Sequence, residues 1–202
     1  MRILALAILM LLSSAASAAD VLEMISEYKK GEYDKALISA RALAAQGDEY
    51  GLYMLGIMHL GGKGVPPDTS AGLVFLKASA EKGNVRAQHD LGLIYGRGES
   101  GVARDSKEAI HWYSLAASQG EPESMYNIGV LYSQGMGVNL DHAEACLWFE
   151  RAAVLGLAPA QFATGECYES GLGGLKDAEK SEHWYHLAEE QGYTAKNLLD
   201  EH

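Results

Sequence analysis

The 202-residue sequence is poor in several features, and each shortage excludes a class of protein. It has only 4 prolines while 48% of its residues are hydrophobic, which excludes a disordered or collagen-like chain and indicates an ordered fold. Its 16 Lys and Arg against 27 Asp and Glu give a net charge of −11, so no broad basic surface exists to neutralise a nucleic-acid backbone. The acidity also argues against docking on anionic lipid, and it favours a basic partner if the partner is charged.

Long hydrophobic runs are scarce, and the one clear run lies near the start of the chain. Met1 and Arg2 form a positive tip, residues 3–12 are apolar, and small residues follow over 13–19. A membrane-spanning helix needs about 20 apolar residues, roughly twice the length of this run. The pattern therefore predicts a secretory signal peptide over residues 1–18, cleaved after Ala18 or Ala19. We expect a periplasmic or secreted protein without membrane insertion.

Signatures of catalysis are scarce as well. The sequence contains no G-x-S-x-G, H-E-x-x-H or phosphate-binding loop. Two segments, Ser26 to Lys29 and Ser79 to Lys82, satisfy S-x-x-K, but the K-T-G and S-D-N segments that accompany this motif in serine β-lactamases are missing. Lysine is also common near helix ends for electrostatic reasons. The sequence therefore predicts a protein that is not an enzyme and has no cofactor.

A metal site is not predicted either. His183 and His186 are three residues apart, with Glu179 and Glu182 nearby, but no third ligand is indicated. His111 occupies the position equivalent to His183 in another part of the sequence, which favours a surface position over a metal ligand.

Internal repetition, by contrast, is abundant. Residues 48–83, 84–120, 121–156 and 157–192 align as four repeats. Each repeat carries a Leu-Gly pair or its equivalent, namely Leu55-Gly56, Leu91-Gly92, Ile128-Gly129 and Thr164-Gly165. A glycine-rich turn follows, and then an aspartate: Asp68, Asp105, Asp141 and Asp177. An aromatic residue stands seven positions later (Phe75, Trp112, Trp148, Trp184), and a glycine closes each repeat.

The spacing predicts a helix, a glycine turn and a second helix in every repeat. The aspartates are placed to cap the second helices, and the closing glycines suit the left-handed position after a helix end. The glycine of each Leu-Gly pair removes a side chain from the inward face, so that the partner helix can approach. One helix pair cannot bury its apolar face alone, but stacked pairs can. We therefore predict an all-α solenoid.

These residues resemble the Sel-one-like repeat family, which is related to the tetratricopeptide repeats. The shared pattern is A-x-x-x-L-G-x-x-Y-x-x-G-x-G-V-x-x-D followed by A-x-x-W-Y-x-x-A-A-x-x-G, and it covers residues 48–192. The resemblance implies a right-handed superhelical solenoid of antiparallel helix hairpins. Residues 19–47 are similar to an ordinary tetratricopeptide hairpin, and residues 193–202 are expected to form a tail or a short cap.

The only two cysteines are predicted to form a disulfide. Cys146 and Cys167 are equidistant from the turn at Gly156 and Leu157, so they are level in an antiparallel helix pair. Their equivalents in the other repeats are mostly apolar, and an exported protein meets oxidising conditions. The alternative is a pair of buried free thiols.

A stripe of side chains on the first helices is the candidate binding site. It consists of Tyr53, His89, Tyr126 and Phe162, with Ile57, Leu93, Val130 and Glu166 four residues on. By helix geometry this stripe lies about 130–160° from the buried direction. The matching positions of tetratricopeptide proteins line a concave peptide-binding groove, and the resemblance implies that role here, with Arg86, Arg97, Glu123 and Glu169 at the rim. Alternatively, the stripe packs between successive first helices and only tightens the superhelix.

We therefore expect a monomeric, non-catalytic scaffold that binds a protein or peptide partner through this groove. The competing function is also implied by the resemblance, because cysteine-rich members of the family have been associated with β-lactam binding or hydrolysis. A β-lactam-binding or muropeptide-binding protein would depend on Ser26 or Ser79.

Overall fold

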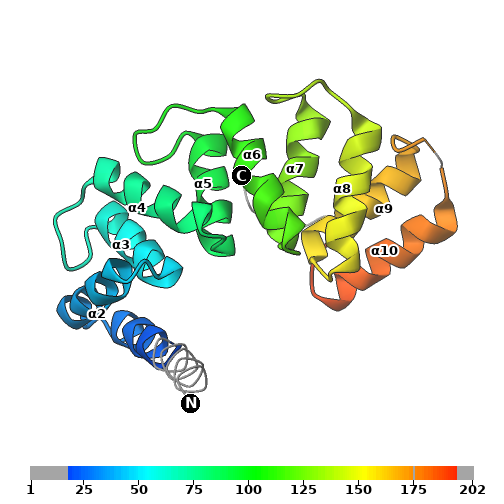
Figure 1. Cartoon of the computed structure of the whole chain (residues 1–202). Coiled ribbons are helices and arrows are strands. Elements are labelled where there is room, and N and C mark those ends of the chain that lie inside the picture. Colours follow the sequence, from blue (N-terminus) through cyan, green and yellow to red (C-terminus); the bar gives the residue numbers. More distant parts are fainter. Residues whose placement is uncertain (1–17, 175, 195–202) are drawn as a thin grey trace, which may run out of the picture. The chain divides into compact units, whose positions relative to one another are not determined.

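A computed structural model describes residues 18–174 and 176–194, and within these ranges every regular element is a helix (Figure 1). The predicted all-α fold class is confirmed for this part of the chain. Residues 1–17 of the expected signal peptide and residues 195–202 of the expected C-terminal tail lie outside the described residues. The chain forms two compact units that divide between Gln88 and His89.

The first unit contains the N-terminal helices. Residues 18–29 are helical, and α2 (Tyr33–Ala45), α3 (Glu49–Gly61) and α4 (Thr69–Glu81) follow. Helix α5 (Val85–Arg97) begins in this unit. Helix α3 packs against both α2 and α4. The inward faces of these elements form one core, made of Met24, Ala36, Leu37, Ala40, Leu43, Met54, Leu55 and Met58.

The second unit contains the rest of α5 and the remaining helix pairs. These helices are α6 (Ser106–Ser118), α7 (Pro122–Gln134), α8 (His142–Val154), α9 (Ala158–Ser170) and α10 (Ala178–Glu190). Each helix from α7 onward packs against the helix before it, and Figure 1 shows α7 beside α8 and α9 beside α10. Alanines such as Ala109, Ala152 and Ala160 are fully buried, which allows these helices to lie close together.

Side chains and glycines at the helix ends explain why the elements start and stop where they do. The four predicted aspartates cap α4, α6, α8 and α10, each accepting hydrogen bonds from backbone amides of the first turn. Gly135 ends α7 in the left-handed conformation with φ 64°, which a side chain would disfavour. The caps therefore set where these helices begin and end through contacts close in sequence.

The glycine of each Leu-Gly pair allows close packing within each repeat, as predicted. A Cβ on Gly129 would lie 2.6 Å from Phe149 Cε1, and a Cβ on Gly165 would lie 2.7 Å from Tyr185 Cδ1. In each repeat, one side chain of the second helix lies against this glycine and covers it. The covering residue directly follows the aromatic residue of the repeat pattern, and in the four repeats it is Leu76, Tyr113, Phe149 and Tyr185. The covering role of these residues was not predicted from the sequence.

Departures from the repeat pattern are accommodated by local contacts. Gly72 replaces the usual alanine in α4, and a Cβ there would lie 2.8 Å from Leu60 Cγ and 3.1 Å from the Gly56 carbonyl oxygen. Ser181 replaces it in α10 and donates a hydrogen bond of 3.0 Å to the Gly165 carbonyl oxygen. Both substitutions therefore still permit a close crossing of the two helices.

No helix in the described ranges combines the length and the apolar character needed to cross a bilayer.

Candidate functional site

The predicted stripe of side chains lies on the first helix of each repeat, and we call it the ladder. Its members come from α3, α5, α7 and α9: Tyr53, Ile57, His89, Leu93, Tyr126, Val130, Phe162 and Glu166. All are half-buried except Glu166, which is exposed. The ladder side chains are therefore in general neither fully exposed to solvent nor fully buried between the helices.

Aromatic contacts in the second, third and fourth repeats explain why the ladder rings are half-buried there. The ring centroids of His89 and Tyr113 are 5.8 Å apart, and those of Phe162 and Tyr185 are 5.1 Å apart. In each case the inner ring is the residue that covers the glycine of the same repeat. The ladder rings thus rest on the side chains that fill the gap between the two helices. In the first repeat this position holds Leu76, so the ring pair is absent there.

A hollow opens beside the ladder in the first unit, and we call it the Tyr53 hollow. Its volume is about 420 Å³. It is lined by Met24, Ile25, Tyr28, Lys29, Tyr50, Tyr53, Met54, Ile57 and Arg86. Met24 and Met54 are 1% and 4% exposed and form an apolar floor, whereas Lys29 and Arg86 are exposed. Burial, and secondarily the neighbouring Tyr33, raise the pKa of Tyr28, so its hydroxyl stays neutral.

The second unit carries a comparable hollow, the Tyr126 hollow. Its volume is about 480 Å³. It is lined by Gly96, Arg97, Arg104, Tyr113, Tyr126, Asn127, Val130, Leu131, Gln134 and Met136. Arg97 forms an ion pair of 3.3 Å with Glu99, and the Arg104 guanidinium contacts the Met136 sulfur. Two ladder residues therefore belong to each hollow, because Tyr53 and Ile57 line the first, and Tyr126 and Val130 line the second.

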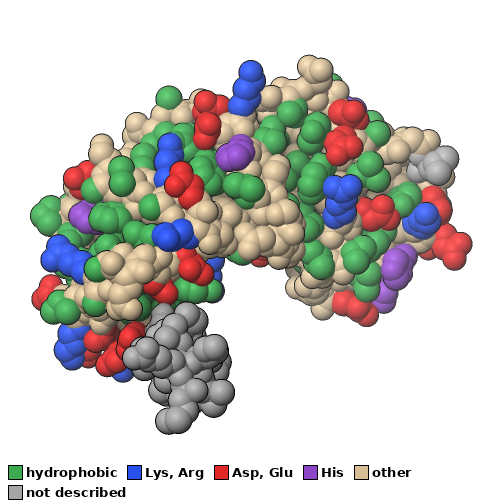
Figure 2. Space-filling model, viewed as in Figure 1, with side chains coloured by type: hydrophobic (Ala, Val, Ile, Leu, Met, Phe, Trp, Pro, Cys, Tyr) green, Lys and Arg blue, Asp and Glu red, His purple; other side chains and the backbone are tan. Residues whose placement is uncertain are grey.

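Charged side chains of both signs reach the surface. On the face drawn in Figure 2, Asp and Glu side chains are interspersed with Lys and Arg, and hydrophobic side chains lie among them. Of the expected rim residues, Arg86, Arg97, Glu123 and Glu169 are all exposed. Glu169 accepts a hydrogen bond of 2.8 Å from the Tyr185 hydroxyl.

His89 has polar contacts that were not predicted from the sequence. Its Nδ1 lies 2.8 Å from Ser124 Oγ and 3.4 Å from Glu121 Oε2, and the Ser124 backbone N–H donates to Glu121. Burial alone would raise the pKa of Glu121, but hydrogen bonds from Glu123 and Ser124 lower it. The hydrogen bond to Glu121, together with burial, raises the pKa of Glu123.

This arrangement of Ser, His and Glu does not form a hydrolytic triad. Ser124 is 0% exposed, so a substrate cannot reach its hydroxyl. Moreover, Ser124 and Glu121 share the same ring nitrogen of His89, whereas a triad uses both ring nitrogens. The contacts instead tie α5 to α7, the first helices of successive repeats.

The serines of the two S-x-x-K segments have different surroundings. Ser79 is fully buried and donates a hydrogen bond of 2.6 Å to the Glu49 carbonyl oxygen, which gives it a structural role. Ser26 is half-buried, and within the described residues no hydrogen bond joins its hydroxyl to Lys29. Lys29 instead lines the Tyr53 hollow.

His183 and His186 are both exposed on α10. His183 packs beside the Trp184 ring at 5.5 Å, and His186 Nε2 lies 3.3 Å from Glu190 Oε1. Within residues 18–174 and 176–194, no group of three His, Cys, Asp or Glu side chains is placed to hold a metal ion.

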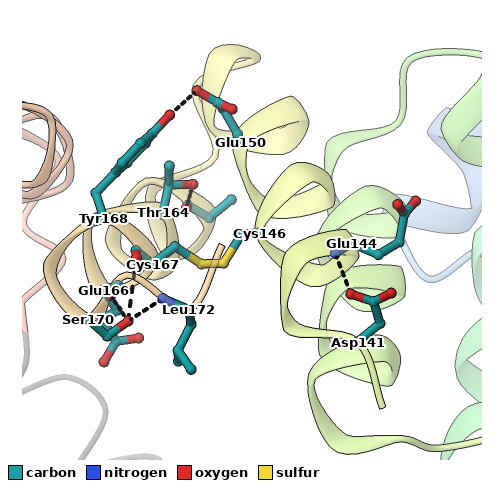
Figure 3. The surroundings of a disulfide bond; sticks show 12 residues. Asp141, Glu144, Cys146, Glu150, Thr164, Glu166, Cys167, Tyr168, Ser170 and Leu172 are labelled. Carbon is teal, nitrogen blue, oxygen red and sulfur yellow. Dashed lines mark hydrogen bonds between the residues drawn. A yellow bond between two sulfur atoms is a disulfide. The ribbon is translucent and has the colours of Figure 1, made fainter. Parts of the chain in front are cut away.

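The predicted disulfide is confirmed. Cys146 on α8 and Cys167 on α9 are bonded, with their Cα atoms 5.9 Å apart (Figure 3). Beside it, the Tyr168 hydroxyl donates a hydrogen bond of 3.0 Å to Glu150. The turn after α9 lies over the bond, since a Cβ on Gly173 would be 3.3 Å from Cys146 Sγ. The disulfide therefore joins the third and fourth repeats.

The contribution of the N-terminal helix to the candidate site was not predicted from the sequence. Met24, Tyr28 and Lys29 line the Tyr53 hollow together with Arg86, which is more than fifty residues later in the chain. The repeat pattern starts at residue 48, so it carried no information on these positions. The resemblance of residues 19–47 to a tetratricopeptide hairpin predicted helices there, but it did not indicate which side chains line the hollow.

Comparison with known proteins identifies the repeat. The family model for the Sel1 repeat matches residues 50–84, 85–121, 122–157 and 158–193 of the sequence. Among solved structures, a Sel1 repeat protein from Oxalobacter formigenes is 30% identical with a TM-score of 0.79, covering 85% of this chain and 70% of that one. No curated protein matches the chain.

A second solved structure is that of a protective antigen present in uropathogenic Escherichia coli strains, described as displaying an SLR fold. It is 29% identical with a TM-score of 0.81, and the match covers 89% of this chain. The chain spans 39% of the length of that antigen.

Proposed function

Because this chain belongs to the Sel1 repeat family, we propose that it is a non-catalytic scaffold that binds a peptide segment of a partner protein along the ladder. Proteins of this family are generally scaffolds for protein–protein interaction. The ladder residues Tyr53, Tyr126 and Phe162 provide the apolar contacts in this proposal, and Arg86 and Glu166 provide polar contacts at the edge.

The observation that carries the proposal is the packing of the ladder rings. Tyr126 rests on Phe149, and Phe162 rests on Tyr185, so each ring is held in place by the helix behind it. A ring that is already ordered loses little conformational entropy when a partner covers it, and aromatic side chains are enriched among the residues that dominate binding energy. The hollows beside Tyr53 and Tyr126 supply depressions for side chains of the partner.

The proposed location is the periplasm or the exterior of the cell. Two observations support it, namely the signal-like pattern over residues 1–18 and the disulfide between Cys146 and Cys167. Disulfides persist in oxidising compartments and are rare in the cytosol. The protein is proposed to act as a monomer.

The β-lactam or muropeptide function is the weaker candidate. It needs an accessible serine that contacts the lysine three residues later. Ser79 is buried and donates a hydrogen bond to the Glu49 carbonyl oxygen, and within the described residues no hydrogen bond joins half-buried Ser26 to Lys29. We therefore favour the scaffold.

The test compares the double variant Tyr53→Ala/Tyr126→Ala with the unaltered protein. Each is cross-linked to its partner in native cell envelopes, and the captured partner is then identified. Val74→Ala is a matched control, because Val74 is 66% exposed on α4, outside the ladder. We expect the double variant to remain helical by circular dichroism yet to lose the partner that the control retains. Equal capture by the double variant would contradict the proposal.

A further inference from the structure

We propose that the Tyr53 hollow binds an acidic peptide, in which an apolar side chain enters the hollow and a neighbouring Asp or Glu carboxylate contacts Lys29 and Arg86. This inference rests on the proposed function and specifies the chemistry of its partner. It also reverses the expectation from net charge, which favoured a basic partner.

The charge of the hollow differs from that of the chain. The chain carries 27 acidic against 16 basic side chains. The residues that line the Tyr53 hollow nevertheless include two cations and neither Asp nor Glu. Local charge, rather than net charge, determines which ligand a site of this size attracts.

Both cations are available to a ligand. In the part of the chain that the structure describes, neither Lys29 nor Arg86 has a side-chain hydrogen bond or an ion pair. Lys35, by comparison, is paired, since its Nζ lies 2.8 Å from Glu32 Oε2. Arg86 also stands in the first turn of α5, where the helix dipole adds to the positive potential.

The floor of the hollow explains why an apolar side chain should accompany the carboxylate. Met24 and Met54 are almost fully buried, and Ile57 is half-buried beside them. Methionine side chains are flexible and adapt to apolar ligands of different shape. A carboxylate at the edge of such a surface is partly desolvated, so its attraction to the two cations is stronger than between fully exposed charges.

The Tyr126 hollow has a similar lining. It contains Arg97 and Arg104, and no Asp or Glu lines it. Arg97 is already paired with Glu99, however, so the positive charge available there is smaller. The proposal is therefore carried by the Tyr53 hollow.

The test is selection of phage-displayed random twelve-residue peptides on the purified, disulfide-bonded protein, followed by fluorescence polarisation with the selected peptides. We expect Asp or Glu within two positions of Leu, Ile, Met or Phe in the selected set. Changing that Glu to Gln in a synthetic peptide should weaken binding roughly tenfold at low salt, since a charge-assisted contact is lost. Added NaCl should reduce the difference.

Variants of the protein locate the effect. In Lys29→Gln/Arg86→Gln, the Glu and Gln peptides should bind equally. The matched control is Arg41→Gln/Lys82→Gln, which removes the same charge from exposed positions outside the hollow and should preserve the preference.

The outcomes separate this inference from the proposed function. Two outcomes would overturn the inference and leave the scaffold proposal intact. One is that the selected peptides depend on Tyr53 for binding but are neutral or basic, and the other is that a Gln peptide binds as well as the Glu peptide. Peptides that bind Tyr53→Ala/Tyr126→Ala as tightly as the unaltered protein, or no selection at all, would overturn both.

Discussion

The ring of Tyr126 lies 5.4 Å from the ring of Phe149, and Phe149 in turn covers Gly129, three residues after Tyr126 on the same helix. One aromatic side chain therefore closes the space between α7 and α8 and supports a ladder ring. The fold and the candidate binding surface are coupled at this point, because any change that displaces Phe149 also removes the support of Tyr126.

Gly129→Ala should test this coupling. The new Cβ would lie 2.6 Å from Phe149 Cε1 and 3.2 Å from the Ala145 carbonyl oxygen, so both helices must shift. We expect a loss of about 1–3 kcal/mol in the free energy of unfolding, measured by urea denaturation.

Gly96→Ala provides the control, since its Cβ would meet Ala109 Cβ at an ordinary 3.5 Å. This change should be neutral or stabilise by up to about 1 kcal/mol, because alanine has the higher helix propensity. Equal effects of the two substitutions would show that the crossing at Gly129 is not tight.

These glycines also show which features of the packing could be predicted from the sequence. The recurrence of Gly129 and its equivalents predicted a close helix crossing, because repetition at a fixed spacing implies a shared packing role. It did not identify Phe149 as the covering residue, since that depends on the angle at which the helices cross. The Tyr53 hollow could not be predicted from the sequence, because Lys29 and Arg86 come to line the same hollow only through tertiary packing. Lys29 also precedes the repeats.

Loss of the disulfide should destabilise the second unit. Cys146 and Cys167 are 21 residues apart, and a loop of this length corresponds to roughly 3 kcal/mol on the chain-entropy model. Cys146→Ser/Cys167→Ser should lower the urea midpoint, and a reducing agent should lower that of the unaltered protein but not that of the variant. Alkylation of both thiols without prior reduction, detected by mass spectrometry, would show that the bond is absent.

The pH dependence of stability should reflect Glu166. Partial desolvation, and secondarily the Glu169 carboxylate, raise the pKa of Glu166 above its ordinary value of 4.5. The folded protein therefore binds this proton more tightly than the unfolded chain does. The resulting stabilisation is complete below the ordinary pKa and is lost as the pH rises through the raised pKa of the folded state.

Glu166→Gln should consequently stabilise the protein at pH 7 by a few tenths of a kcal/mol, a small effect because the side chain is exposed. It should have no effect near pH 3, where the carboxyl is protonated in both states. Thermal unfolding at the two pH values measures the difference. Glu182→Gln serves as the control, because it neutralises an exposed carboxylate on a different helix, α10. Stabilisation of the same size by both variants would assign the effect to net charge instead.

Ser79→Ala should distinguish a structural serine from a catalytic one. The buried Ser79 hydroxyl donates to the Glu49 carbonyl oxygen across the interface of α3 and α4, and its removal leaves that acceptor without this donor. We expect a loss of about 1 kcal/mol in stability, while Ser118→Ala, at an exposed hydroxyl bonded within its own helix, should have little effect. Nitrocefin should remain uncleaved by the unaltered protein and by both variants. Turnover that disappears in Ser79→Ala without a change in the unfolding midpoint would instead support the β-lactam function, because loss of a structural hydrogen bond should lower that midpoint.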